Sequence, residues 1–313
     1  MSRTLCHRRE FLSDTGLAAA AVLCGGTAAR AAAETADRLH VSINQWSVGA
    51  IRRRDQQDAK IAFDDELAGL AAAGINGLEP GLASADQVEA LAGQLAQHGL
   101  QMRSIYTGSA VDDPANVDQE LERITALAKR AKEAGAKIVV TNPRPLPNRQ
   151  GKSDQQLQTQ AAALNTLGHA LAALGVTLAY HNHDVELQFA AREFHHMMAG
   201  TDPAALSLCL DAHWVYRGAG HSQVALFDVL KLYGSRVVEL HLRQSTGNIW
   251  SEAFGDGDVD YRALAGKLLA ANRRPLLVLE QGPENGTPQT LRTADVHRRS
   301  AHYVREVFAR FAL

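Results

Sequence analysis

Four glycines in the first half of the chain each separate a helix-like segment from a short run of strand-forming residues. The helix-like segments are 65–73, 85–98, 117–134 and 156–174, and the glycines that follow them are Gly74, Gly99, Gly135 and Gly175. Glycine readily adopts the left-handed backbone conformation that ends many helices. A helix–glycine–strand unit that recurs in this way predicts a parallel sheet with helical crossovers.

The same pattern extends over residues 34–313 and gives eight expected strands. They are 39–43, 75–79, 100–105, 137–140, 176–180, 206–210, 237–240 and 276–279. No linker rich in Pro, Gly or Ser divides this stretch, and eight units are the number that closes a barrel. A doubly wound open sheet is the competing fold, but no glycine-rich dinucleotide loop follows the first strand. The sequence therefore predicts an α/β fold consisting of a single (β/α)8 TIM barrel.

Side chains that bind metals stand directly after four successive strands of the second half. They are His181, Asp211, His241 and Glu280. In a parallel barrel, the carboxyl ends of neighbouring strands meet at one rim, so these four groups should converge. A lone histidine at a strand end is usually structural, but four ligand types at matching positions predict a divalent-metal site.

Further acidic and basic groups stand close to the same rim and are candidate catalytic residues. Glu280 can serve both as ligand and as general base, while His183 and Glu186 follow the fifth strand as alternative bases. His183 could instead orient a ligand. Glu79 ends the second strand, where it is either catalytic or part of a salt bridge across the barrel mouth.

A set of aromatic and basic residues is assigned to the same rim as substrate contacts. It comprises Trp46, Tyr106, His213, Trp214, Arg243 and Trp250. Aromatic rings stack on the C–H faces of sugars, although they also serve ordinary packing. Cys209 is the one cysteine after residue 33, so no internal disulfide is expected there, and we interpret it as a small buried hydrophobic residue.

The beginning of the chain has the features of an export signal. Arg8-Arg9-Glu10-Phe11-Leu12 is a twin-arginine motif, followed by an apolar stretch at 17–23 that is too short for a stable membrane span. Small residues before position 34 suit signal peptidase, so we expect residues 1–33 to be a cleaved Tat signal, with the Tat translocase as a transient partner. The expected location is the periplasm, without a stable membrane anchor.

Net charge argues against a nucleic-acid partner. Removal of residues 1–33 takes away four Arg and two acidic residues, so the formal charge changes from −2 to −4. No basic stripe remains for a phosphate backbone. The expected partner is a small sugar, and the sequence does not specify an oligomeric state.

Several motifs in the second half resemble those of one enzyme family. They are the run from Tyr180 to Glu186, the segment Asp211-Ala212-His213-Trp214 with Gly218-Ala219-Gly220, the triplet His241-Leu242-Arg243, the loop from Gly255 to Tyr261, and Leu279-Glu280-Gln281. The loop looks like the one that caps the seventh helix in the sugar phosphate isomerase/epimerase family, whose members have the xylose isomerase-like barrel, and the other motifs resemble that family's signatures at strands five to eight. Over the first half, only Glu79 and Trp46 suggest the resemblance.

The resemblance implies a Mn²⁺-like ion bound from strands five to eight, with Mg²⁺, Co²⁺, Fe²⁺ or Zn²⁺ as alternatives. It also implies ring opening or enolisation of a sugar on that ion. Many epimerases of this fold carry glutamate where this chain has His181, and they move protons with two metal-bound glutamates. Glu280 alone remains of that pair, which favours reactions that need one base.

We therefore expect a metal-dependent enzyme that abstracts a proton next to a carbonyl of an unphosphorylated sugar or keto-sugar. Isomerisation, epimerisation and the β-elimination of a 3-keto-glycoside share that first step. The alternatives are a non-catalytic periplasmic sugar-binding protein and an endonuclease IV-like metal nuclease. The nuclease is disfavoured because it requires a basic groove for DNA.

Overall fold

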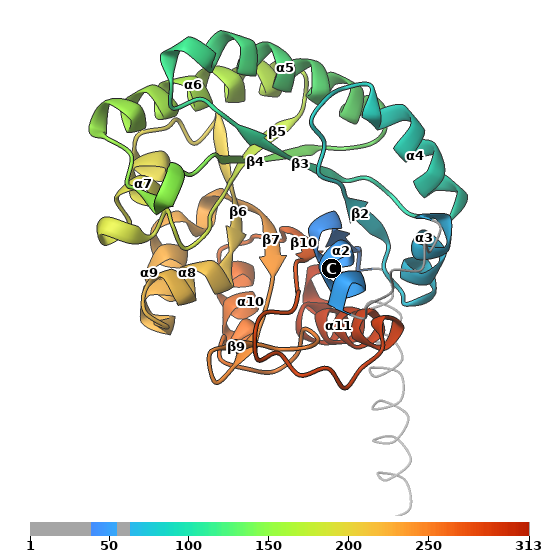
Figure 1. Ribbon diagram of the computed structural model, residues 1–313. Coiled ribbons are helices and arrows are strands. Elements are labelled where there is room, and N and C mark those ends of the chain that lie inside the picture. The colour runs from blue at the N-terminus through green and yellow to red at the C-terminus, as the bar shows by residue number, and fades with distance from the viewer. Residues whose placement is uncertain (1–38, 55–62, 313) are drawn as a thin grey trace, which may run out of the picture.

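The computed structural model describes residues 39–54 and 63–312, and the expected signal peptide at 1–33 lies outside them. Eight parallel strands surround the centre of the molecule, and helices form a ring outside them (Figure 1). The strands are β1 Val41–Asn44, β2 Gly77–Glu79, β3 Ser104–Ser109, β4 Ile138–Pro143, β5 Thr177–His181, β6 Leu206–Asp211, β7 Val237–Leu242 and β10 Leu276–Leu279. The predicted TIM barrel is confirmed.

The sheet order is β2-β1-β10-β7-β6-β5-β4-β3, and the seam between β2 and β3 closes the barrel through isolated bridges. Gly77 bridges Gln101, and Gly81 bridges Tyr106. The backbone amide of Tyr106 donates to the carbonyl of Pro80 at 2.8 Å. The barrel is therefore nearly continuous in its hydrogen bonding.

The outer helices are α2 Gln45–Arg54, α3 Phe63–Ala72, α4 Gln87–Gln97, α5 Pro114–Glu133, α6 Asp154–Ala173, α7 Gln188–Ala199, α8 Ala212–Gly218, α9 Gln223–Tyr233, α10 Tyr261–Ala270 and α11 Thr293–Val307. The four helices predicted in the first half are present within three residues of their expected ends. All four glycines that follow them have positive φ, between 67° and 104°. This left-handed conformation is the local cause of the repeated helix–strand junction.

Side chains cap several of these helices. Ser153 and Gln156 form a reciprocal capping box at the start of α6, in which the Ser153 hydroxyl accepts from the Gln156 amide. At α5 the carboxylate of Asp113 accepts from the amide of Ala115, and Pro114 occupies the first turn. These contacts satisfy amide groups that have no partner within a helix.

One predicted strand was misplaced. We expected it at 100–105, whereas β3 runs from Ser104 to Ser109. Before β3, Gln101 makes an isolated bridge. Leu100 and Met102 are buried, which explains the apolar signal that suggested a strand. The true strand contains mainly small and polar residues, and its position is determined by pairing with β4 over six consecutive residues.

The barrel interior differs from the packing between strands and helices. Leu, Ile and Val residues fill the outer layer, whereas a small cluster of Val140, Ala179 and Cys209 lies inside the barrel. Buried charged residues share that interior, among them Glu79 and Glu239, both fully buried. The fold thus directs ionisable side chains along the axis toward one rim.

A short antiparallel hairpin, β8 Ser245–Thr246 and β9 Ile249–Trp250, follows β7 and was not predicted. It places Trp250 beside Trp214, the third residue of α8, with ring centroids 5.5 Å apart.

Within residues 39–54 and 63–312, none of the helices combines the length and hydrophobicity needed to span a bilayer.

Candidate metal centre and active-site pocket

Four predicted ligands converge at the carboxyl end of the barrel. Potential ligand atoms of His181, Asp211 and Glu280 lie within 4.8 Å of one another. The fourth residue, His241, places its Nδ1 3.3 Å from Glu280 Oε2. The sheet register contributes directly to this arrangement, since Asp211 on β6 pairs with His241 on β7. All four residues are buried.

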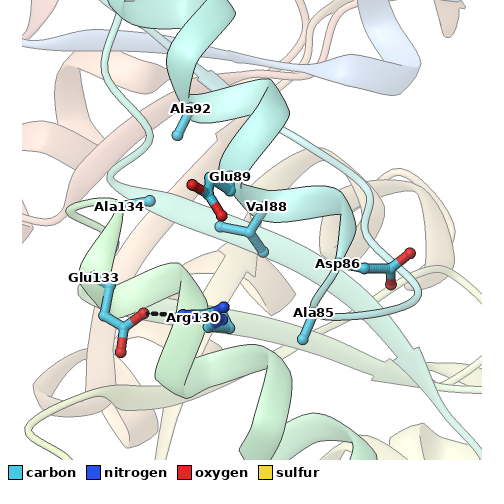
Figure 2. Close-up of a pocket in the computed structure, with 8 residues that line it drawn as sticks. All are labelled: Ala85, Asp86, Val88, Glu89, Ala92, Arg130, Glu133 and Ala134. Carbon is cyan, nitrogen blue, oxygen red and sulfur yellow. Dashed lines mark hydrogen bonds and ion pairs between the residues drawn. The ribbon is translucent and has the colours of Figure 1, made fainter.

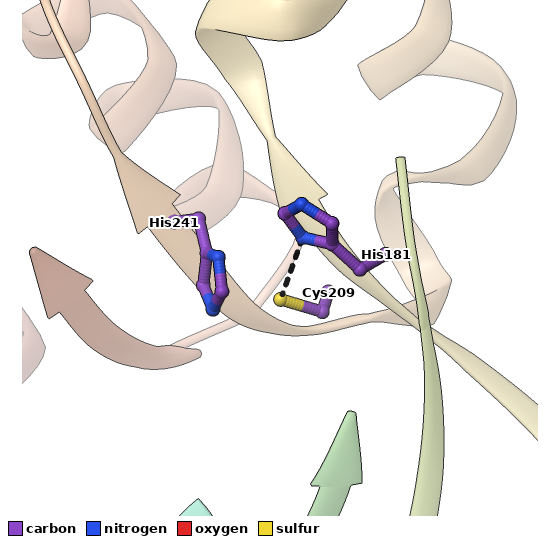
Figure 3. Close-up of side chains that lie close together, drawn as sticks. All are labelled: His181, Cys209 and His241. Carbon is purple, nitrogen blue, oxygen red and sulfur yellow. Dashed lines mark hydrogen bonds between the residues drawn. The ribbon is translucent and has the colours of Figure 1, made fainter. Parts of the chain in front are cut away.

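Each imidazole has one nitrogen engaged by the protein and one without a hydrogen-bond partner among the described residues. His181 Nδ1 lies 3.7 Å from Cys209 Sγ, inside the barrel (Figure 3), and its Nε2 has no partner. His241 Nε2 lies 3.0 Å from Glu79 Oε2 and 3.3 Å from Glu239 Oε1, while Nδ1 makes no hydrogen bond. This is how proteins orient histidines that bind metals.

Asp211 is oriented by the helix that follows it. Its Oδ1 accepts from the amide of Trp214 at 2.8 Å and so caps α8, whereas Oδ2 has no hydrogen-bond partner in the described part of the chain. Burial raises the pKa of Asp211 to about 7, although Arg243 acts in the opposite direction. One carboxylate oxygen is thereby fixed and the other remains available for a cation.

The other three ligands differ in their electrostatics. Burial opposes charge on His241, yet Cys209, Glu79 and Glu280 raise its pKa well above the usual value, so a metal ion bound there would displace its proton. Burial, with the neighbouring His241 and His183, lowers the pKa of His181 well below its usual value, so that its lone pair is free. Burial opposes charge on Glu280, yet His241 and Arg243 hold its pKa well below the usual range. Buried donor atoms without hydrogen bonds are costly unless a ligand satisfies them. Two imidazole nitrogens and two carboxylates therefore fit a divalent metal ion.

A second level of carboxylates lies beneath His241. Glu79 accepts from Asn44 Nδ2 at 2.6 Å as well as contacting His241. Burial, together with repulsion from Glu79, raises the pKa of Glu239 to about 8. Glu79 therefore supports the imidazole from the side away from the pocket, and it does not line the pocket itself.

The pocket above the ligands has a volume of about 540 Å³. It is lined by Asn44, Gln45, Trp46, Gly81, Tyr106, His183, Trp214, Arg243, Trp250 and Glu280. This volume lies in the range of small-molecule sites. Five of the six predicted substrate contacts line it, as do two of the four predicted catalytic residues.

Three tryptophans surround the guanidinium of Arg243. Its Cζ lies 5.0 Å from the ring centroids of Trp46 and Trp214 and 4.2 Å from that of Trp250. Its Nη2 donates to Glu280 Oε2 at 2.8 Å, while Nε and Nη1 are buried without hydrogen-bond partners among the described residues. Arg243 therefore presents fixed donors next to the pocket carboxylate.

Two predicted site residues lie behind the pocket wall. His213 is buried, and its Nε2 forms a hydrogen bond of 2.9 Å with Ser245 Oγ of the hairpin. Glu186 accepts from Asn142 Nδ2 and from the amide of His183, so it fixes the loop that carries His183. Burial raises the pKa of Glu186 to about 7. Both residues thus contact neighbours of the pocket, and not its interior.

Sequence reasoning overlooked Asn44 and Glu239. A signal for Glu239 existed, because it interrupts an apolar strand and stands two residues before His241, on the same face. Asn44 ends β1 at the rim, and its register partner on β2 is Glu79.

A cavity of about 340 Å³ between α4 and α5 (Figure 2) contains the Arg130–Glu133 ion pair and lies in the outer helical layer.

The chain belongs to the xylose isomerase-like TIM barrel family, whose family model matches residues 67–302. The inosose dehydratase of Geobacillus kaustophilus (strain HTA426) is 22% identical over 262 residues, which cover 72% of this chain and 83% of that protein. The sugar phosphate isomerase/epimerase resemblance stated from the motifs is thereby confirmed at the level of the family.

Solved structures show the same fold at low identity. The 3-keto-D-glucoside 4-epimerase from E. coli is 15% identical with a TM-score of 0.63, covering 86% of this chain and 99% of that one. A xylose isomerase-like TIM barrel protein from Mycobacterium smegmatis, solved in complex with magnesium, is 16% identical with a TM-score of 0.63. The match covers 88% of this chain and 97% of that one.

Proposed function

We propose that this protein is a divalent-metal-dependent carbon–oxygen lyase that removes a proton next to the carbonyl of an unphosphorylated 3-keto-glycoside. The proposal rests on which candidate metal ligand reaches the pocket. Of the four predicted metal ligands, Glu280 is the one that also lines the pocket, so a single ligand carboxylate faces the substrate. An elimination requires one base to start it, whereas a two-base epimerisation requires a second acid–base group on the other face of the sugar.

His181, Asp211, His241 and Glu280 would hold the cation, for which Mn²⁺ is our first choice. A bound divalent ion polarises a carbonyl and acidifies the neighbouring C–H bond. The mixed nitrogen and oxygen ligands also suit Fe²⁺, Co²⁺ and Zn²⁺, and the mycobacterial relative was solved with magnesium.

Glu280 is the proposed proton acceptor. It is buried at the pocket floor, and His241 and Arg243 keep it in the carboxylate form by lowering its pKa. Arg243 Nη1, which makes no hydrogen bond within the described residues, belongs to the same guanidinium that pairs with Glu280 and can hydrogen-bond an oxygen on which negative charge develops. His183 is the rival base, because it lines the same pocket and burial lowers its pKa, which leaves its ring neutral near pH 7.

The tryptophans of the pocket would bind the sugar ring and exclude water. Trp214 and Trp250 meet edge to face, and Trp46 meets Trp250 in the same way at 6.2 Å between centroids. Such surfaces pack against the C–H faces of a pyranose ring. They are also consistent with a neutral substrate, which agrees with the expected export of this chain to the periplasm.

The names of similar proteins bear on whether the reaction is an elimination or an isomerisation. A dehydratase removes water in an elimination, and one relative is an inosose dehydratase. A structural neighbour acts on a 3-keto-D-glucoside. Both names indicate a substrate that carries a ketone, as the proposed reaction requires.

The test is to incubate Mn²⁺-loaded protein with 3-keto-glycosides, free keto-sugars and an inosose in D₂O. NMR would follow deuterium at the carbon next to the carbonyl and release of the aglycone alcohol. We expect both signals with a 3-keto-glycoside and neither in metal-free protein. Deuterium exchange without alcohol release would favour an isomerase or epimerase. Ligand binding with no exchange for any compound would identify a non-catalytic sugar-binding protein.

A further inference from the structure

A second cavity of about 640 Å³ adjoins the active-site pocket. It lies over the carboxyl ends of β2, β3 and β4, and it shares Gly81 and Tyr106 with the pocket. We call this cavity the β3–β4 groove. Because Gly81 and Tyr106 line both spaces, the groove adjoins the pocket at these two residues.

Two glycines keep the groove open. A Cβ atom added at Gly81 would meet nothing within 4 Å, and one at Gly108 would meet only the carbonyl oxygen of Asn142, at 3.9 Å. Neither glycine has a positive φ, so the backbone does not require glycine at either site. The absence of side chains there therefore leaves space that a ligand can occupy.

The groove is also held rigid by one arginine. The guanidinium of Arg123 donates to the carbonyls of Ala83 and Gly108 at 2.9 and 2.7 Å, and to the hydroxyl of Thr107 at 3.0 Å. These bonds connect the loop after β2 with strand β3, which form two walls of the groove. A wall fixed in advance costs little conformational entropy when a ligand binds.

The groove combines apolar surface with polar groups at its edge. Leu82 and Pro145 contribute apolar atoms, while Asn142 and the half-exposed Arg144 provide hydrogen-bonding groups. This lining suits a neutral polyhydroxylated or aromatic alcohol, which presents both an apolar face and hydroxyl groups. A compact keto-sugar ring would already be accommodated by the 540 Å³ pocket.

We infer that the substrate has two parts, with its keto-sugar ring in the pocket and its leaving alcohol in the β3–β4 groove. This inference rests on the proposed function. It distinguishes a glycoside from a free cyclitol or monosaccharide, which would leave the groove without an occupant. At the junction, the hydroxyl of Tyr106 hydrogen-bonds the glycosidic oxygen that leaves.

The step balances without an oxidant or reductant. The base takes the proton from C2, and the C–H electron pair forms the C1–C2 double bond. The C1–O bond breaks with its electron pair on the leaving oxygen, which receives a proton and departs as an alcohol. The ketone at C3 is retained in the unsaturated sugar product.

Substitution of a groove glycine tests the two-part substrate. Gly108→Leu fills the groove, whereas Gly93→Leu places the same side chain on the exposed surface of α4, where a Cβ meets nothing within 4 Å. We expect Gly108→Leu to raise KM for 3-keto-cellobiose at least about tenfold and KM for methyl 3-keto-β-glucoside less than about threefold. Gly93→Leu should change neither value. Equal losses on both substrates, or no loss on either, overturn the inference.

A binding measurement separates this inference from the proposed reaction. Calorimetry would compare cellobiose with methyl β-glucoside in Mn²⁺-loaded wild-type and Gly108→Leu protein. Loss of a wild-type preference for the disaccharide supports the groove even if no elimination is detected. Elimination that proceeds with no preference in wild type refutes the groove alone.

Tyr106→Phe tests the contact with the leaving oxygen. The change keeps the ring that packs against His181 and removes the hydroxyl. A positioned proton donor contributes about 10²-fold or more when the leaving group is a poor one. With methoxide as the leaving group, we expect kcat to fall by that factor. With p-nitrophenoxide, kcat should fall less than about tenfold. Deuterium exchange at C2 should persist. The same loss with both leaving groups overturns the role of Tyr106.

Discussion

Glu79→Gln should weaken metal binding although Glu79 touches neither the pocket nor the proposed cation. Its Oε2 lies 3.0 Å from His241 Nε2, and both side chains are fully buried, so solvent screens the interaction little. Cys209, Glu79 and Glu280 raise the pKa of His241 well above its usual value against the effect of burial; with a cation bound, Glu79 beside Nε2 would keep the remaining proton on that nitrogen and leave Nδ1 as a ligand. Partners of this kind are typically worth 10- to 100-fold in metal affinity, or about 1.4–2.7 kcal/mol.

The neighbouring Glu239 supplies a matched control. Its Oε1 forms a hydrogen bond of 3.3 Å with the same nitrogen, and Gln would keep an acceptor oxygen there; burial and the proximity of Glu79 raise the pKa of Glu239 to about 8. Glu239→Gln at pH 7 therefore exchanges one largely neutral group for another, and we expect less than about a threefold loss. In Glu79→Gln, by contrast, an amide N–H₂ is placed where Oε1 now has no hydrogen-bond partner among the described residues.

The assay is calorimetric titration of Mn²⁺ into each variant, with circular dichroism to check folding. ¹⁵N NMR of the histidine rings reads the tautomer of His241 directly and does not depend on catalysis. Unchanged affinity in Glu79→Gln, or equal losses in Glu79→Gln and Glu239→Gln, would refute the argument that Glu79 selects the tautomer.

Three further predictions address the base, the ligands and export. Glu280→Gln should lower turnover about 100-fold or more with little change in substrate affinity, and a dead, metal-loaded His183→Asn beside an active Glu280→Gln would instead assign the base to His183. Because burial raises the pKa of Asp211 to about 7 and protonation removes a ligand, Mn²⁺ affinity should fall as pH decreases below about 7; a flat profile between pH 5.5 and 8, or full metal occupancy in Asp211→Ala, would contradict its role. Changing Arg8 and Arg9 together to Lys should block export and cleavage before position 34, which intact-mass measurement of the wild-type and variant proteins can check.

The fold was predictable because its determinants are local. Helices α3 to α6 are each followed by a glycine with positive φ, and a strand comes after each glycine. Strand β3 is the informative failure. Its residues Ser104–Ser109 carry little hydrophobic signal, and pairing with the adjacent strand β4 determines where it begins. Such long-range pairing is not visible in a window of neighbouring residues.

Convergence of the candidate metal ligands was predictable from topology, while the direction of residues beyond the strands was not. Alternation along a strand holds only while the strand lasts, and β5 ends at His181. In the turn that follows, His183 enters the pocket, whereas Glu186 folds back to accept from the amide of His183. Loop geometry therefore separated two residues that the sequence presented as equivalent candidates.

The burial of so many ionisable groups is itself an argument for a site and against ordinary packing. Glu79, Glu239, Asp211 and Glu280 lie in one barrel interior, and among them His241 contacts carboxylates at both of its nitrogens. Isolated buried charges are unfavourable unless they are paired or bind a metal. The carboxylates have different partners. Asn44 and His241 contact Glu79 below the candidate ligands, and Arg243 pairs with Glu280 at the pocket. Of the candidate ligands, Asp211 Oδ2, His181 Nε2 and His241 Nδ1 make no hydrogen bond within the described residues, and potential ligand atoms of His181, Asp211 and Glu280 lie within 4.8 Å of one another. A barrel selected for stability alone would fill that position with apolar side chains. The arrangement is therefore best understood as a ligand set, built on a lower layer that orients it.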